Sequence, residues 1–433
     1  MPSNQASDHV YAQQAAPAAV PADLPKIEDF MHAKVRTLSH VPKAAQTEWA
    51  RLLTDLLWAV NNDPSNESSH CLLLLAPACI LHTPPRGGRG HQRQLASTIK
   101  SRITKWRDGE ISGLWKDAIT PPHPGQRLSR RQRQNQQPRS TEEEQAAANR
   151  RRCLRLVQDF QYSRGIQAPN SRGIDQSSPA AFDAMQGKHP QRPVVNQGPD
   201  PPPALVLNLE QVKKAVLSFR AGTAPGPSGL RAEHLKSALK APTPSRGEGF
   251  LSALTKFCNL MASGKVPQAI APYFFGANLF AANKKDGGHR PIAVGEVLRR
   301  LIAKCLAFES STKAADLLAP LQVGVGVKNG LDAAVHALRA VMEDAAIPAQ
   351  SKWVLQLDFQ NAFNSVERDK VFAAVRAHFP ELAAWVESCY SGQAFLYFGN
   401  AIITGTTGLH QGDPLASLLF ALAILPLLKR LKE

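Results

Sequence analysis

The sequence lacks the features that would place it in a membrane or stabilise it through disulfides or zinc. Its two longest apolar runs, residues 71–81 and 415–428, each contain a proline and are too short to span a bilayer. Six cysteines are spread over 433 residues without a Cys-x-x-Cys pair, which argues against a zinc knuckle or a disulfide framework. The first thirty residues lack the basic start and apolar stretch of a secretory signal. A reducing intracellular compartment fits these absences best.

Acidic residues are scarce relative to basic ones. The chain has 35 Asp and Glu against 51 Lys and Arg, which gives a formal net charge of +16 and a pI near 9.8. A charge of this size and sign indicates an anionic partner. Hydrophobic residues make up 43% of the chain, and 433 residues are enough for two or three domains with a sizeable core.

Most of the excess positive charge lies in one segment. Residues 86–155 hold 17 Lys and Arg against 6 Asp and Glu, a local charge of +11. Leu95, Ile99, Ile103 and Trp106 recur at helical spacing, which predicts an amphipathic basic helix. The basic side chains here could neutralise phosphates and bind nucleic acid without sequence preference. A solvated linker is an equally good interpretation, since few aromatics are interleaved. The candidate nucleic-acid-binding residues are Arg86, Arg89, Arg93, Lys100, Arg102, Lys105 and Arg107.

Composition and periodicity divide the chain into four parts. Residues 1–30 are rich in Ala, Pro and Gln and are predicted to be disordered. Residues 31–166 are predicted to be a helical basic region, with a disordered loop near 121–145. Residues 167–203 are rich in proline and are interpreted as a linker. Residues 204–433 are expected to form a compact domain.

The compact part begins with a glycine- and proline-rich loop and a basic hairpin. The stretch AGTAPGPSGLRAEHLK, residues 221–236, predicts a loop that opens a helix near Ala232. Further on, NKKDGGHRPI places Lys284, Lys285 and Arg290 around a Gly-Gly turn, before a short strand at residues 291–294. Lysine and arginine together suit the binding of phosphate oxygens, although an ordinary basic hairpin would explain this stretch taken alone.

An acid follows directly after the apolar run WVLQL. This run, residues 353–357, predicts a buried strand, with Asp358 at its end as a candidate metal ligand. A lone aspartate in such a place is more often a turn former or helix cap, by roughly three to one. Asn364 or Ser365, with Glu367, is predicted to cap the next helix, and its buried stripe is predicted to be Phe372, Val375 and Phe379.

The last forty residues predict a hairpin, a loop and a helix. FLYF and AIIT flank Gly399-Asn400, a two-residue connection of the Gly-first hairpin type. The loop GTTGLHQGD ends at Asp413, a predicted N-cap, with Pro414 at the first helical position. Gln411 and Gly412 show no folding role in the sequence. A glycine permits the close approach of another molecule, and an amide can bond a sugar or base edge.

Taken in this order, the segments resemble the reverse transcriptase domain of retrotransposons that lack long terminal repeats. The resemblance implies an α+β right-hand polymerase fold, with fingers and the first part of a palm. It implies that Lys284, Lys285 and Arg290 contact the incoming triphosphate and that Asp358 binds metal. It further implies that Phe363 excludes a ribose 2′-hydroxyl and that Gln411 and Gly412, in GLHQGDPLASLLF, line the nucleotide pocket.

The implied activity is RNA-directed DNA polymerisation, which uses an RNA template, a DNA primer and deoxynucleoside triphosphates, without a membrane. A complete polymerase of this family would need Mg²⁺, and the family implies a nuclear location. Its other carboxylates come from an aromatic-x-Asp-Asp hairpin, whereas this sequence has no Asp-Asp pair. The chain is therefore expected to be truncated and inactive alone. The competing interpretation is a non-catalytic nucleic-acid-binding protein.

Overall fold

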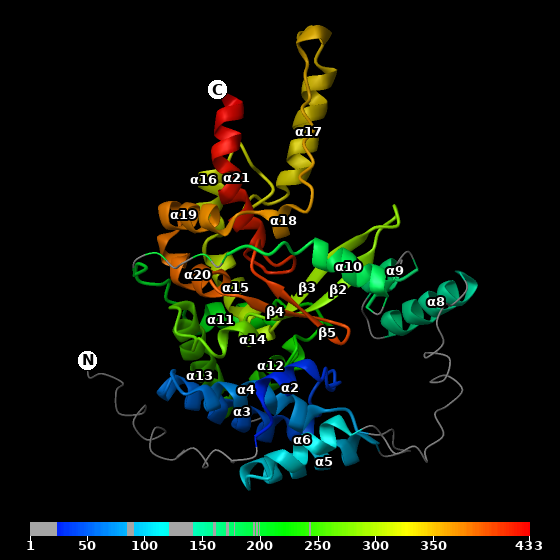
Figure 1. Cartoon of the computed structure of the whole chain (residues 1–433), viewed down its shortest axis with the longest axis vertical. Coiled ribbons are helices and arrows are strands. Elements are labelled where there is room, and N and C mark those ends of the chain that lie inside the picture. The colour runs from blue at the N-terminus through cyan, green and yellow to red at the C-terminus, as the bar shows by residue number, and fades with distance from the viewer. Residues whose placement is uncertain are drawn as a thin grey trace.

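A five-stranded sheet surrounded by helices forms the centre of the protein (Figure 1). The structure is a computed structural model that describes residues 24–84, 91–120, 142–158, 162–169, 173–176, 178–193, 195, 198, 200–241 and 244–433. The mixture of helices and strands agrees with the predicted α+β class. In the view of Figure 1, the N-terminal helices lie below the sheet, and helices α17 (Gly330–Glu343) and α21 (Ala416–Lys432) project above it.

The N-terminal helices pack on the later part of the chain rather than standing apart. The Trp49 indole donates to the His234 carbonyl at 3.2 Å, and the Asn61 amide donates to the Ala253 carbonyl at 2.9 Å. Phe30 is buried in the first helix, so the prediction of disorder to residue 30 is wrong for residues 27–30, while residues 1–23 lie outside the described residues. The elements are α2 (Ile27–His32), η1 (Lys43–Ala45), α3 (Gln46–Asn62), α4 (Glu67–Leu81), α5 (His91–Arg107) and α6 (Ile111–Ile119).

The predicted linker contains regular structure. Its described residues include β1 (Ile174–Asp175), which pairs with the sheet, and α10 (Pro179–Gly187), whose Ala181 and Met185 are buried against it. The Ser178 hydroxyl accepts a hydrogen bond from the Ala181 N–H at 3.1 Å and so caps α10. The linker prediction is therefore wrong here, because a local cap and helical apolar spacing outweigh the proline-rich composition. Upstream lie α8 (Glu142–Gln158), which occupies the end of the predicted 121–145 loop, and α9 (Tyr162–Gln167); residues 121–141 lie outside the described residues.

Two hairpins that the sequence predicts build most of the sheet. Strands β2 (Ala277–Asn283) and β3 (His289–Gly295) pair antiparallel, with Ala277 opposite Gly295. Strands β4 (Ala394–Phe398) and β5 (Ala401–Gly405) form the second antiparallel pair, and β4 lies parallel to β2. Gly399 has φ of 54°, as the predicted two-residue turn requires. Strands β3 and β5 thus stand at opposite edges, and β1 pairs with the far end of β2.

The glycine- and proline-rich loop at 221–231 is fixed against the end of β3. The Ser228 N–H and hydroxyl donate to the buried Glu296 carboxylate at 2.7 and 2.6 Å. A Cβ on Gly226 would lie 2.7 Å from the Glu296 Cα, so only glycine fits there. The following helix begins at Ala232 as predicted. The helices of this part are α11 (Leu209–Leu217), α12 (Ala232–Leu239), α13 (Pro244–Ala262), α14 (Ala271–Phe274), α15 (Val297–Glu309) and α16 (Ser311–Leu318).

Helix α17 and the chain that returns beside it form an arm that projects from the body (Figure 1). After η3 (Ala349–Ser351), residues 352–360 return without strand pairing. Trp353 is 89% exposed and Leu355 70% exposed, so the prediction of a buried strand at 353–357 is wrong in this structure. A strand needs a hydrogen-bonding neighbour, and no described residue pairs with this run.

The C-terminal helices follow the predicted apolar pattern, but the caps predicted at residues 364–367 are not made. Phe372, Val375 and Phe379 are buried as expected. The Asn364 amide contacts His189 Nε2 at 2.8 Å instead of capping, and the Glu367 side chain makes no capping hydrogen bond to α19. Helix α21 begins at Ala416, two residues after the predicted start. The remaining elements are α18 (Ala362–Ser365), α19 (Arg368–His378), η4 (Pro380–Leu382) and α20 (Ala383–Tyr390). Among the described residues, no helix has the length and apolarity needed to cross a bilayer.

Candidate functional site

The loop at residues 408–413 connects the edge of the sheet to the short helix α18. The Ala293 N–H in β3 donates to the Gln411 carbonyl at 3.1 Å, and the Leu409 N–H donates to the Phe363 carbonyl at 2.6 Å. Three segments that are distant in the sequence are thereby joined: the basic hairpin, the turn after Asp358, and the Gln411-Gly412 loop. The structure thus brings Phe363 and Gln411 into one neighbourhood.

Two glycines make these close approaches possible. Gly408 has φ of 66°, and a Cβ there would lie 2.3 Å from the carbonyl carbon of Asn364. Gly412 has φ of 127°, and a Cβ there would lie 2.6 Å from the Ala293 carbonyl oxygen. Both positions therefore require glycine. The space at Gly412 is used by the protein's own strand, which corrects the interpretation that Gly412 has no folding role.

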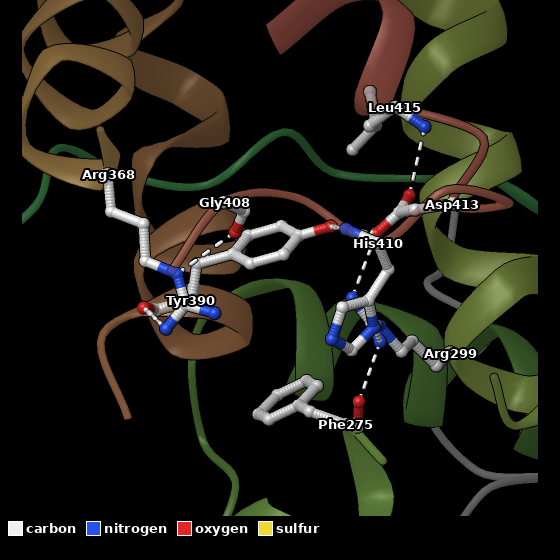
Figure 2. A network of polar contacts seen from close by, with 8 residues as sticks. All are labelled: Phe275, Arg299, Arg368, Tyr390, Gly408, His410, Asp413 and Leu415. Carbon is white, nitrogen blue, oxygen red and sulfur yellow. Dashed lines mark hydrogen bonds and ion pairs between the residues drawn. The ribbon is translucent and has the colours of Figure 1, made fainter. Parts of the chain in front are cut away.

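A buried polar network lies beneath the loop (Figure 2). Arg299 and Asp413 form an ion pair at 3.0 Å, and their side chains are only 2% and 3% exposed. The Arg299 guanidinium also donates to the Phe275 carbonyl at 2.7 Å, and the Tyr390 hydroxyl donates to the Asp413 carboxylate at 2.7 Å. A buried carboxylate is stable only when such partners satisfy it. The role of Asp413 is thus to hold the end of the loop to α15 and α20.

His410 completes this network as a neutral side chain. Burial, reinforced by the nearby guanidinium groups of Arg299 and Arg368, holds the pKa of His410 well below its usual value. Its Nδ1 lies 2.6 Å from an Arg299 nitrogen. A neutral imidazole can accept a hydrogen bond from that guanidinium N–H. The His410 imidazole therefore stays neutral near neutral pH while it helps to fix the loop.

A second buried arginine holds the start of the loop. The Arg368 guanidinium donates to the carbonyls of Gly408, Tyr390 and Gly392 at 3.0, 2.8 and 2.9 Å. Burial lowers the pKa of Arg368 to about 10, so the side chain still carries its charge at neutral pH. Sequence reasoning missed both Arg299 and Arg368. The available signal was an arginine next to buried apolar positions in a helix, as in VLRRLIAKCLA around Arg299.

The predicted triphosphate ligands are exposed on the β2–β3 hairpin. Lys284 and Lys285 occupy its turn and Arg290 lies near the start of β3, three residues before the contact between Ala293 and the loop. The turn is closed by the Lys284 N–H, which donates to the Gly288 carbonyl at 2.8 Å. These cations can therefore reach an anion in solvent.

Asp358 belongs to no cluster of candidate metal ligands among the described residues. It is exposed on the return run of the arm, and the described residues contain no group of three or more His, Cys, Asp or Glu side chains that could hold a metal ion. A pair of Mg²⁺ ions needs clustered oxygen ligands. One exposed carboxylate does not fit that requirement, so no metal-dependent step can be assigned to the described residues.

The candidate nucleic-acid-binding side chains differ in what they contact. Arg102 donates to the carbonyls of Ile80 and His82 at 3.1 and 2.9 Å, so it stabilises the fold rather than facing phosphates, contrary to the prediction. Arg107 lies 3.7 Å from Glu48, and Lys105 lies 4.0 Å from Glu110. Lys100 is exposed on α5. Arg86 and Arg89 lie outside the described residues, as does the side chain of Arg93.

Residues 282–433 match the family model for the reverse transcriptase (RNA-dependent DNA polymerase). The match supports a reverse transcriptase domain in this part of the chain. It begins within β2 and includes the basic hairpin turn, Asp358 and the 408–413 loop. The basic helix α5 lies outside it. No curated protein matches the chain.

Proposed function

We propose that this chain is the nucleotide- and template-binding part of an RNA-directed DNA polymerase from a retrotransposon that lacks long terminal repeats. Residues 204–433 would form the fingers and the first part of the palm of a right-hand polymerase. Its partners would be an RNA template, a DNA primer and deoxynucleoside triphosphates. The observation that carries the proposal is the joining of β3, α18 and the 408–413 loop within the segment that matches the family.

Each part of this junction has a chemical role in the proposal. Lys284, Lys285 and Arg290 bind the triphosphate, because their exposed cations suit phosphate oxygens. The Gln411 side chain hydrogen-bonds the sugar or base. The Phe363 ring, whose centroid lies 5.4 Å from that of Phe420, is half-buried and held in place, as a steric barrier to a 2′-hydroxyl would have to be.

A second candidate function follows from the isolation of Asp358. In this role the chain would bind nucleic acid and nucleotide, while the described residues supply no carboxylate cluster that could stabilise the attacking and leaving oxygens. A non-catalytic nucleic-acid-binding role is therefore the alternative. The two functions differ in whether the affinity for a nucleotide depends on the template base.

Nucleotide binding at the hairpin tests the main proposal. The purified chain with an RNA–DNA template–primer should bind the deoxynucleotide that matches the template, and it should extend no primer. Replacing Lys284, Lys285 and Arg290 together with glutamine should weaken this binding by about tenfold or more, since charge-assisted phosphate contacts are lost. Equilibrium fluorescence titration with a labelled deoxynucleotide measures the affinity.

The matched control is Lys265→Gln, which removes an exposed lysine outside the family match and should leave nucleotide affinity unchanged. Binding that ignores the template base would favour the non-catalytic alternative. Primer extension that disappears in Asp358→Ala would show instead that the chain catalyses by itself.

The salt dependence of RNA binding tests whether the basic helix α5 contacts nucleic acid. Replacing Lys100 and Lys105 with glutamine should lower the affinity for RNA and reduce the dependence of log affinity on log salt by about one to two. Filter binding over a series of salt concentrations measures this slope. Replacing Arg102 with methionine should instead lower the unfolding midpoint and leave the salt slope unchanged, because its guanidinium binds backbone carbonyls. An unaltered slope in the double lysine variant would exclude Lys100 and Lys105 from the interface.

A further inference from the structure

Helix α17 carries an apolar stripe that nothing in the described structure covers. Every residue from 331 to 343 is exposed, including Leu331 at 71% and Leu338 at 47%. The stripe is completed by Val335, Val341 and Met342, each about half exposed. Soluble proteins seldom leave contiguous apolar surface of this kind uncovered, because burying it is favourable. This face of α17 is therefore suited to contact with a partner.

The spacing of the stripe is symmetric about its centre. Leu331, Val335, Leu338 and Met342 follow one another at steps of four, three and four residues, which reads the same in both directions. We propose that α17 pairs with α17 of a second copy of this chain, antiparallel about a two-fold axis near residues 336 and 337. Leu331 then packs on Met342 of the other copy, and Val335 packs on Leu338.

Charge complementarity supports the antiparallel direction. Asp332 and Arg339 lie one position after Leu331 and Leu338, so both are on the same flank of the stripe. In an antiparallel pair this flank contacts the same flank of the second chain. Asp332 of each chain then lies beside Arg339 of the other, which gives two such ion pairs. In a parallel pair the same flank would meet Ala334 and Val341, and the charges would have no counterpart.

The shape of the molecule leaves this surface accessible. Figure 1 shows α17 projecting away from the body, and the nearby Trp353, Val354 and Leu355 extend the exposed apolar surface of the arm. The base of the helix is fixed, because Gly330 is buried and a Cβ there would lie 1.8 Å from the Val323 carbonyl oxygen. An arm that is rigid at its base can present the stripe to a second copy. This pairing is independent of the proposed polymerase role.

Charge exchange at the flank tests the pairing. The full chain should sediment as a dimer, with twice the 47.0 kDa mass of one chain. Asp332→Arg alone and Arg339→Asp alone should each weaken the dimer by about tenfold or more, since each places like charges together twice. Mixing these two variants should restore a dimer containing one of each, and the double variant should dimerise like the original. Analytical ultracentrifugation over a series of concentrations measures the dissociation constants.

Aspartate substitutions at apolar positions distinguish pairing through the stripe from unspecific association. Leu338→Asp should give a monomer, whereas Val206→Asp, at an exposed apolar position outside the arm, should leave the dimer intact. Circular dichroism establishes that each variant is folded. An original chain that stays monomeric at all concentrations, a Leu338→Asp variant that still dimerises, or single-charge variants that fail to pair on mixing would each overturn the proposal.

Discussion

Replacing Arg299 with methionine should lower the free energy of unfolding by about 3–5 kcal/mol, the usual cost of leaving a buried charge without its partner. Asp413 would keep the Tyr390 hydroxyl but lose the guanidinium at 3.0 Å, in surroundings where its carboxylate is 3% exposed. The 408–413 loop should then separate from α15, and nucleotide affinity should fall along with stability. Urea unfolding of the variant and the original chain measures the difference.

Two further variants isolate the cause. Arg192→Met breaks an exposed ion pair with Glu367, and the expected loss is only about 0–1 kcal/mol. Adding Asp413→Asn to Arg299→Met removes the uncompensated charge and should recover part of the lost stability. If Arg299→Met costs no more than Arg192→Met, the buried ion pair does not hold the loop. If the double variant is no more stable than Arg299→Met, lost packing is the cause.

Sequence reasoning succeeded where the determining interactions are local. The Gly399-Asn400 turn fixes the β4–β5 hairpin within two residues, and the Gly-Gly turn does the same for β2 and β3. The helix at Ala232 and the buried stripe from Phe372 to Phe379 follow from periodicity alone. Such elements carry their own start, stop and burial signals.

The failures occurred where distant contacts decide the outcome. The run WVLQL has the composition of a buried strand, but a strand exists only if another strand lies beside it, and residues 353–357 have none among the described residues. Conversely, Ile174 and Asp175 sit in proline-rich surroundings and still form a strand, because β2 offers them an edge. Neither pairing can be read from the residues of one segment.

The same distinction between local and distant contacts applies to the candidate site. The sequence places Lys284 and Lys285 in the turn of the basic hairpin through a local Gly-Gly signal, and they lie there in the structure, while their contact with nucleotide stays a prediction. Asp413 was assigned a local role as a helix cap, and its carboxylate does accept the Leu415 N–H at 2.9 Å. Its ion pair with Arg299, 114 residues away in the chain, depends on how α15 packs and was not predictable.

Acidification should destabilise the protein through its buried histidines. His234 is fully buried, its Nε2 lies 2.7 Å from the Leu38 carbonyl, and burial lowers its pKa to about 3. Burial also lowers the pKa of His82 to about 4, with the Arg102 charge adding to the effect. Above the ordinary histidine pKa of about 6.5, the folded and unfolded chains are both neutral at these positions and no penalty arises.

Below that pH the unfolded chain takes up protons that the folded chain cannot, so the free energy of unfolding falls as the pH drops from about 6.5 towards 3. At pH 5, His234 alone should account for a loss of about 2 kcal/mol. Urea unfolding at a series of pH values measures the slope. In His234→Gln the amide can still donate to the Leu38 carbonyl but does not titrate, so its stability should fall less steeply between pH 6.5 and 5 than that of the original chain. Equal slopes in the two proteins would mean that His234 is protonated in the folded state, which would require the helix carrying it to open at mild acidity.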